Sequence, residues 1–246
     1  WQFSLLGFLV GLMVGLTGIG GAAVMTPLLI LVGGVRPVIA VGTDLLYGAI
    51  TKAAGAFFHW RHRTVDLPVV KRLGIGSIPM ALVGVGCIKW MMGGTRNDAV
   101  DHFVSQALGL ALILVALNLL LRPIRRHGPV LPTPSSHSGP QRTLTVILGA
   151  GIGFLVGLTS VGSGSLIAAA LITVYPELPP RRVVGTDIFH AAFLTAAAGL
   201  AHLGLGNVDV LLLGQLLIGS IPGVWLGSRL AVTLPERLLR PVLACL

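Results

Sequence analysis

Long apolar stretches alternate with short polar segments along the whole chain. Two unusually long apolar runs, 3–32 and 143–174, are broken by glycine and hydroxyl residues. Ordinary apolar spans follow them, at about 38–58, 68–88 and 103–121 in the first half and about 183–205, 210–227 and 237–246 in the second. Because a helix needs about 20 apolar residues to cross the hydrocarbon core, this pattern predicts an all-α polytopic membrane protein.

The second half of the chain repeats the first. The offset between matching positions is 142 or 143 residues, and five matches occur in the same order, which chance among many glycines does not explain. The matches join Gly15–Gly20 to Gly157–Gly162, Val41–Asp44 to Val184–Asp187, His59 to His202, Val65–Asp66 to Val208–Asp209, and Gly76–Pro79 to Gly219–Pro222. We therefore predict a first transmembrane repeat at 1–121 and a second at 143–246, joined by a Pro- and Ser-rich linker at 122–142.

The Lys and Arg residues favour one of two topologies. If each long run crosses the membrane once, both sides receive 8 basic residues. If each run is instead a re-entrant pair of half-helices, one side receives 13 and the other only Arg36, Lys89 and Arg96. The positive-inside rule selects the second arrangement, which has a cytoplasmic linker and external termini. The predicted fold is thus two inverted repeats, each a broken re-entrant helix pair plus three transmembrane helices.

The composition supports a membrane protein and removes other classes. The chain is 54% hydrophobic and only 10% charged, against roughly 25% charged residues in soluble domains. The net charge of +9 resides in short loops between apolar runs, which argues against nucleic-acid binding. Cys87 and Cys245 form no CxxC motif, so no metal site or cofactor is predicted. The expected partners are membrane lipid and a small anion, and a homodimer remains open.

The two broken segments are candidate substrate-binding sites. Irregular backbone at membrane depth must be buried in protein or line a wet cavity. A helix that restarts after each break points free N–H groups into the protein, which suits an anion. The alternative is that these glycines only allow close helix packing. The predicted substrate-binding residues are Thr17, Gly18, Gly20 and Gly21 in the first segment, Thr159, Ser160, Gly162, Ser163 and Ser165 in the second, and the motif threonines Thr43 and Thr186.

Asp44, Lys52, Asp187 and His190 fall inside predicted spans, where each charge is costly. Lys52 is predicted to bind the substrate anion, because every other Lys or Arg lies in a loop or near the start of a predicted span. Asp44, Asp187 and His190 are predicted to couple transport to protons, and the spacing of Asp187 and His190 places them on one helix face. The alternative is a structural buried ion pair. Ser77 and Ser220 are expected to bond carbonyls freed by nearby prolines, and His202 is expected at a membrane interface.

These repeated motifs resemble the sulfite exporter TauE/SafE family, also called the toluene-sulfonate uptake permeases. The resemblance rests on the duplicated glycine-broken first helix, the Val-Gly-Thr-Asp motif and the Gly-Ser-Ile-Pro motif. It implies a secondary carrier of the bacterial inner membrane that moves sulfite, organosulfonates or related small anions. This chain has Asp44 and Asp187 where many members of that family have Ser or another small residue.

Two other functions are compatible with the sequence. Broken helices also form the selectivity filters of channels, so an anion channel is the first alternative. An intramembrane enzyme is the second, since Asp187, His190 and a serine could form a hydrolase triad. The chain has no Gly-x-Ser-x-Gly, HExxH, P-loop or Rossmann motif, so the sequence predicts a transporter rather than an enzyme.

Overall fold

The structure is a computed structural model that describes residues 1–17, 22–93, 98–121 and 139–233. Within these residues every regular element is a helix, as the sequence predicts. The helices are α1 (Gln2–Thr17), α2 (Ala22–Leu31), α3 (Pro37–Arg61), α4 (Leu67–Met92), α5 (Asp98–Leu121), α6 (Gly139–Thr159), α7 (Ser165–Val174), α8 (Pro180–Gly204) and α9 (Val210–Thr233).

Local sequence signals fix where several helices begin and end. Proline occupies the first turn of α3, α4 and α8, where its missing N–H costs no helical hydrogen bond. The Asp66 carboxylate caps α4 by accepting a 3.3 Å bond from Val69 N, and Asp209 Oδ1 accepts a 2.9 Å bond from Leu212 N in α9. Gly93 ends α4 with a left-handed φ of 50°. An aspartate at the repeat-related position therefore caps the corresponding helix in each repeat.

Five described helices are long and apolar enough to cross a membrane, namely α4, α5, α6, α8 and α9. The sequence also predicts a span at α3. This helix is continuous over 25 residues, but its apolar sequence contains the charged residues Asp44 and Lys52. Helix α6 begins at Gly139, within the last residues of the predicted linker. The span expected at 237–246 and most of the linker lie outside the described residues.

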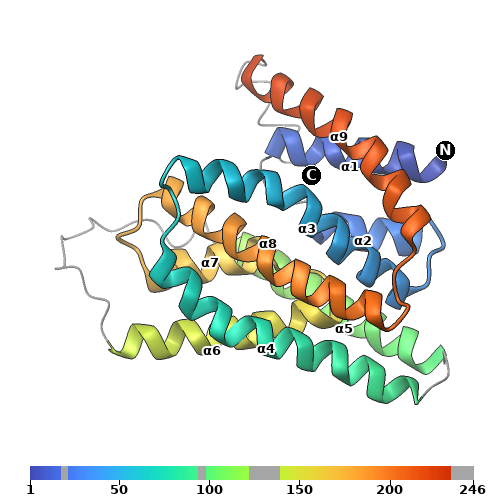
Figure 1. Ribbon diagram of the computed structural model, residues 1–246, viewed down its shortest axis with the longest axis horizontal. Coiled ribbons are helices and arrows are strands. Elements are labelled where there is room, and N and C mark those ends of the chain that lie inside the picture. Colours follow the sequence, from blue (N-terminus) through green and yellow to red (C-terminus); the bar gives the residue numbers. More distant parts are fainter. Residues whose placement is uncertain (18–21, 94–97, 122–138, 234–246) are drawn as a thin grey trace.

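Close backbone contacts join helices from different repeats (Figure 1). Helix α6 runs alongside α4 in the same direction, with Gly149, Gly153 and Gly157 against Leu73, Ser77 and Ala81. A Cβ atom at Gly153 would collide with the Ser77 carbonyl. Helix α1 packs on α9 in the corresponding way, with Gly7 and Gly11 against Leu216 and Ser220. The small residues thus allow each repeat to pack its first helix against a helix of the other repeat.

Helices α3 and α8 lie side by side between these two pairs and run in opposite directions (Figure 1). Gly42 near the start of α3 abuts the Asn207 carbonyl beyond the end of α8, and Gly185 near the start of α8 abuts the Thr64 carbonyl beyond the end of α3. These two contacts are related by the sequence repeat, since the offset is 143 for both pairs of positions. Because the start of each helix contacts the residues beyond the end of the other, α3 and α8 form an antiparallel pair.

Each of the two short helices returns toward the beginning of the helix before it. The Tyr175 hydroxyl, directly after α7, lies 2.8 Å from Thr145 Oγ1 in the second turn of α6. Arg72 Nη1, at the start of α4, donates to the same hydroxyl at 3.2 Å. In the first repeat Gly33, just after α2, lies against the ring of Phe3. Helices α1–α2 and α6–α7 are therefore two hairpins.

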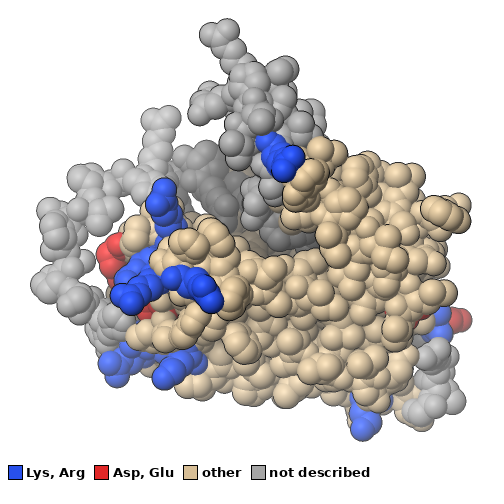
Figure 2. Space-filling view, turned by 45° about the horizontal axis from the view of Figure 1, so that its top comes forward, with Lys and Arg blue, Asp and Glu red and all other residues tan. Residues whose placement is uncertain are grey.

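The basic residues gather at one end of the molecule (Figure 2). This basic end is formed by the end of α3 and the starts of α4, α6 and α8, and it carries Arg61, Arg63, Lys71, Arg72, Arg142, Arg181 and Arg182. Among the described residues, only Arg36 and Lys89 carry a permanent positive charge at the opposite end. The two ends are separated by a broad surface with few charges, as expected for a protein embedded in lipid.

Candidate substrate and coupling site

The segment between α6 and α7 is an irregular turn inside the helical core. Ser160 adopts a φ of 63° and Gly162 a φ of 101°, both in the left-handed region. A non-glycine residue there is uncommon, and such residues concentrate at functional sites. No side chain caps the N-terminus of α7, which begins at Ser165. The sequence prediction of a break at Thr159–Ser165 is therefore confirmed for the second repeat.

Three ionisable side chains from α3 and α8 meet this turn. Asp44 Oδ2 accepts a 2.9 Å hydrogen bond from the Ser160 hydroxyl. Lys52 Nζ donates a 2.6 Å hydrogen bond to Ser163 Oγ. A Cβ atom built on Gly164 would lie 3.9 Å from the carboxylate of Asp187. We call this group, together with a nearby imidazole, the central cluster: Asp44, Lys52, Ser160, Ser163, Asp187 and His190.

Asp44 is completely buried and only partly satisfied. Its Oδ2 also accepts a 2.5 Å hydrogen bond from Thr26 in α2, so hydroxyls from both hairpins meet on one oxygen. Within the described part of the chain, Oδ1 has no hydrogen-bond partner. A buried carboxylate without full pairing is costly, and natural proteins keep such groups at functional sites. Asp44 thus links the first hairpin, the central helix α3 and the turn of the second hairpin.

Lys52 supplies the one amine of the central cluster. The carboxylates of Asp187 and Asp44 are close enough to interact with its charge. It also interacts with the ring of His190. If both carboxyl groups are ionised and the imidazole is neutral, the central cluster has a net charge of −1. An entering anion would add to this charge, so its binding depends on how many protons the central cluster holds.

His190 makes its hydrogen bond with Ser77 in α4, with 2.8 Å between Nε2 and Oγ. Its Nδ1 has no partner among the described residues, so the ring is not hydrogen-bonded to Asp187. The expectation that Ser77 bonds a carbonyl freed by a proline is therefore wrong. Tyr47 takes the position of His190 in the first repeat, and Ser220, which is related to Ser77, donates to the Leu217 carbonyl at 3.4 Å. The bond between a serine and an imidazole thus occurs in only one of the two repeats.

The remaining predicted substrate-binding residues lie in several places. Thr43 Oγ1 accepts a 3.1 Å bond from Asp209 N, and Thr186 Oγ1 accepts a 2.9 Å bond from Asp66 N. These two hydroxyls connect α3 and α8 to the caps of α9 and α4. Thr159 Oγ1 donates to the Leu155 carbonyl at 2.7 Å within α6. Thr17 is the last residue of α1, and Gly18, Gly20 and Gly21 lie outside the described residues.

Two polar contacts of this region are absent from the sequence-based prediction. Thr26 has no polar counterpart in the second repeat, so superposing the repeats gives no signal for it. His202, expected at a membrane interface, is fully buried, and its Nε2 lies 3.0 Å from the Gly157 carbonyl near the end of α6. That expectation is wrong because α6 covers the end of α8. The sequence did show that His202 is repeated, since it matches His59, but not that it would be buried.

Comparison with known proteins gives a consistent result. The family model "Sulfite exporter TauE/SafE" matches residues 3–246. The Bacillus subtilis "Probable membrane transporter protein YjnA" is 43% identical over 246 residues, which cover 98% of this chain and 93% of the relative. The B. subtilis "Probable membrane transporter protein YunE" is 27% identical, covering 95% and 87%. A Xylella fastidiosa "Probable membrane transporter protein" is 27% identical, covering 93% and 83%. No solved structure matches the chain.

Proposed function

Because this chain belongs to the sulfite exporter TauE/SafE family, we propose that it is a secondary transporter of sulfite, organosulfonates or similar small anions. Its place in the family makes it a multi-pass membrane transporter of bacteria rather than an enzyme. The position of the anion-binding site, the chemistry of the anion and the coupling of transport to protons are our proposals. We place the anion at the turn between α6 and α7.

The hydrogen bond between Lys52 and Ser163 is the observation that carries the proposed site. It brings an ammonium to the uncapped start of α7, so that a positive charge and free backbone N–H groups are close together. Both features favour an anion, and neither would be expected in a core stabilised by apolar packing alone. The hydroxyls of Ser160 and Ser163 offer further donors once they turn away from their present partners.

We also propose that the two repeats are inverted in the membrane. Support comes from the antiparallel pairing of α3 and α8, which a two-fold axis in the membrane plane produces. The positions of the hairpins also support inversion. Hairpin α6–α7 starts and finishes near the basic end, whereas α1–α2 starts and finishes near the opposite end. The basic end is then cytoplasmic by the positive-inside rule. The two hairpins meet at Asp44, where Thr26 and Ser160 both donate.

Cysteine labelling at two repeat-related turns tests this topology. Val32, 71% exposed between α2 and α3, and Glu177, exposed between α7 and α8, are replaced singly in a protein whose Cys87 and Cys245 are serine. In intact cells we expect a membrane-impermeant maleimide to label Val32→Cys but not Glu177→Cys. Permeabilised cells serve as the control, in which both sites should react. Labelling of both sites from outside would contradict the inverted arrangement.

Transport by the purified protein tests the proposed function itself. Proteoliposomes containing the protein should accumulate radiolabelled sulfite or methanesulfonate faster than empty liposomes, with saturation at high concentration. The same anions should raise the melting temperature of the protein, because a ligand that binds only the folded state stabilises it. Absence of flux with both anions would exclude the proposed substrate class. Unitary currents in planar bilayers would show that the protein is a channel rather than a carrier.

A further inference from the structure

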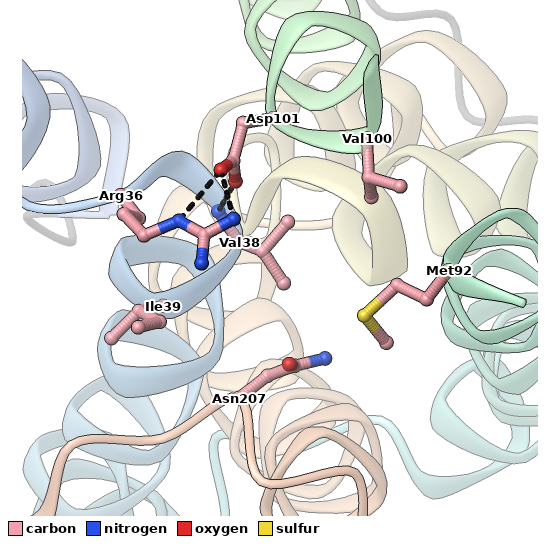
Figure 3. A pocket seen from close by; sticks show the side chains of 7 residues that line it. All are labelled: Arg36, Val38, Ile39, Met92, Val100, Asp101 and Asn207. Carbon is pink, nitrogen blue, oxygen red and sulfur yellow. Dashed lines mark hydrogen bonds and ion pairs between the residues drawn. The ribbon is translucent and has the colours of Figure 1, made fainter. Parts of the chain in front are cut away.

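A small pocket opens at the end of the molecule opposite the basic end (Figure 3). The starts of α3 and α5, the end of α4 and the loop between α8 and α9 meet there, and no residue of the central cluster lines the pocket. Arg36 lies 16 residues before Lys52, about 24 Å away along α3. The lining residues are Arg36, Val38, Ile39, Met92, Val100, Asp101 and Asn207.

Arg36 is held at the pocket by Asp101 but keeps donors available. Its Nε and Nη2 lie 2.8 and 2.6 Å from the same oxygen, Asp101 Oδ2. The other carboxylate oxygen, Oδ1, accepts from Val38 N at 3.3 Å. A guanidinium has five N–H donors, so Asp101 uses only part of this capacity. Figure 3 shows the third guanidinium nitrogen pointing away from Asp101, to the side on which Ile39 and Asn207 lie.

Asn207 supplies a second donor that lacks an acceptor. Its side chain is 1% exposed, and Nδ2 has no hydrogen-bond partner among the described residues. Figure 3 shows this amide nitrogen directed into the pocket. The residue is held in place through its backbone, since its N–H donates to the His202 carbonyl at 3.0 Å. A buried amide donor without a partner destabilises the protein, and a bound acceptor would offset this loss.

We propose that this pocket is a docking subsite for one small oxyanion, the sulfite ion or the sulfonate group of an organic substrate. The inference rests on the proposed function and adds an external first contact to it. Arg36 and Asn207 supply N–H donors on two sides, and the apolar neighbours Val38, Met92 and Val100 strengthen hydrogen bonds to an anion by excluding water. The Asp101 carboxylate binds the guanidinium of Arg36 when no anion is present, so the anion and this carboxylate compete for Arg36.

Equilibrium binding separates the pocket from the central cluster. The full-length protein carrying Lys52→Gln is titrated calorimetrically with sodium sulfite and, separately, with sodium methanesulfonate, with sodium chloride as reference. We expect weak residual binding in this background. Adding Arg36→Gln should weaken it about 10-fold, since a charge-assisted hydrogen bond is lost. Adding Asp101→Asn should instead strengthen it about 5-fold, since a partly exposed competing charge is removed.

The matched control is Lys89→Gln, which removes an exposed basic residue from the same end without touching the pocket. Residual binding should be unchanged in that variant. The inference is wrong if the Lys52→Gln background binds neither anion, if Arg36→Gln leaves the binding intact, or if Asp101→Asn weakens it. The last result would make Arg36–Asp101 a purely structural ion pair. The two anions also tell whether the pocket accepts the inorganic ion, the sulfonate group or both.

Transport kinetics provide a second measurement that does not need the Lys52→Gln background. In proteoliposomes, Arg36→Gln should raise the KM for anion added to the external face about 10-fold and leave the maximal rate unchanged. An unchanged KM would contradict the docking subsite. Failure of the proposed function has a different signature, because the parent protein would then transport neither anion while the calorimetric comparison of Arg36 and Asp101 variants still reports on the pocket.

Discussion

Lys52→Gln is expected to lower the affinity for the transported anion about 10- to 100-fold, since hydrogen bonds to charged groups contribute about 1.5–3 kcal/mol. The substitution removes the ammonium bound to Ser163 and also leaves Asp44 and Asp187 without their positive neighbour. Repulsion between these carboxylates and the anion then adds to the loss. Flux of sulfite or methanesulfonate into proteoliposomes, measured against concentration, gives the change in KM and in maximal rate.

Two variants make the Lys52 prediction specific. Lys52→Arg retains the positive charge and should retain a substantial part of the flux. Lys89→Gln removes an exposed lysine at the end of α4 and should behave as the parent protein. The melting temperature of each variant in detergent shows whether it is folded. If folded Lys52→Gln protein binds and transports the anion with unchanged KM, Lys52 has a structural role and the site at the α6–α7 turn is wrong.

Asp187→Asn is expected to abolish the response of transport to a pH gradient while some anion flux remains. Protonation of Asp187 removes a negative charge beside Gly164, where the proposed anion binds, so a proton and an anion should bind together. Asparagine cannot take up this proton and mimics the neutral state permanently. Its flux should then follow the anion gradient alone. Imposing an external acid shift on proteoliposomes and comparing the initial rates of parent and variant measures this difference.

The controls use the other carboxylates of the chain. Asp98→Asn, exposed in the first turn of α5, should keep the parental pH response. Asp44→Asn tests whether the repeat-related carboxylate shares the task. A permanent hydrogen-bonded pair of Asp187 and His190 does not fit the structure, since His190 bonds Ser77 instead. If Asp187→Asn follows the pH gradient as the parent does, another group carries the proton.

The helices themselves were largely predictable from the sequence. Membrane segments must satisfy their backbone hydrogen bonds internally, so long apolar stretches become helices irrespective of their neighbours. Prolines and capping aspartates then mark the ends, and the predicted spans at α4, α5, α8 and α9 appear with shifts of a few residues. The start of α6 was not predicted, because its first turn at Gly139 lies before the apolar run. Gly-Pro-Gln-Arg has low hydropathy, which hides a helix that begins before the apolar run.

The candidate site was predictable only in part. Repetition drew attention to the Val-Gly-Thr-Asp motif and to the break at Thr159–Ser165, and rarity within an apolar span identified Lys52. Neither signal indicated which partners these side chains would find. Thr26, unremarkable in the sequence, donates to Asp44, whereas the repeated threonines Thr43 and Thr186 accept bonds from the caps of other helices.

By itself, the sequence determined a duplicated, helical membrane protein with polar breaks and a few intramembrane charges, because hydropathy, repetition and helix-capping residues are local properties. Only the tertiary structure decided that each repeat packs its first helix on the other repeat, and that Asp44 reaches Ser160, 116 residues away. Lipid is as apolar as the helix surfaces, so hydrophobicity does not select helix partners. The selection comes from small residues such as Gly153 that admit a neighbouring backbone, and this complementarity exists only between two folded surfaces.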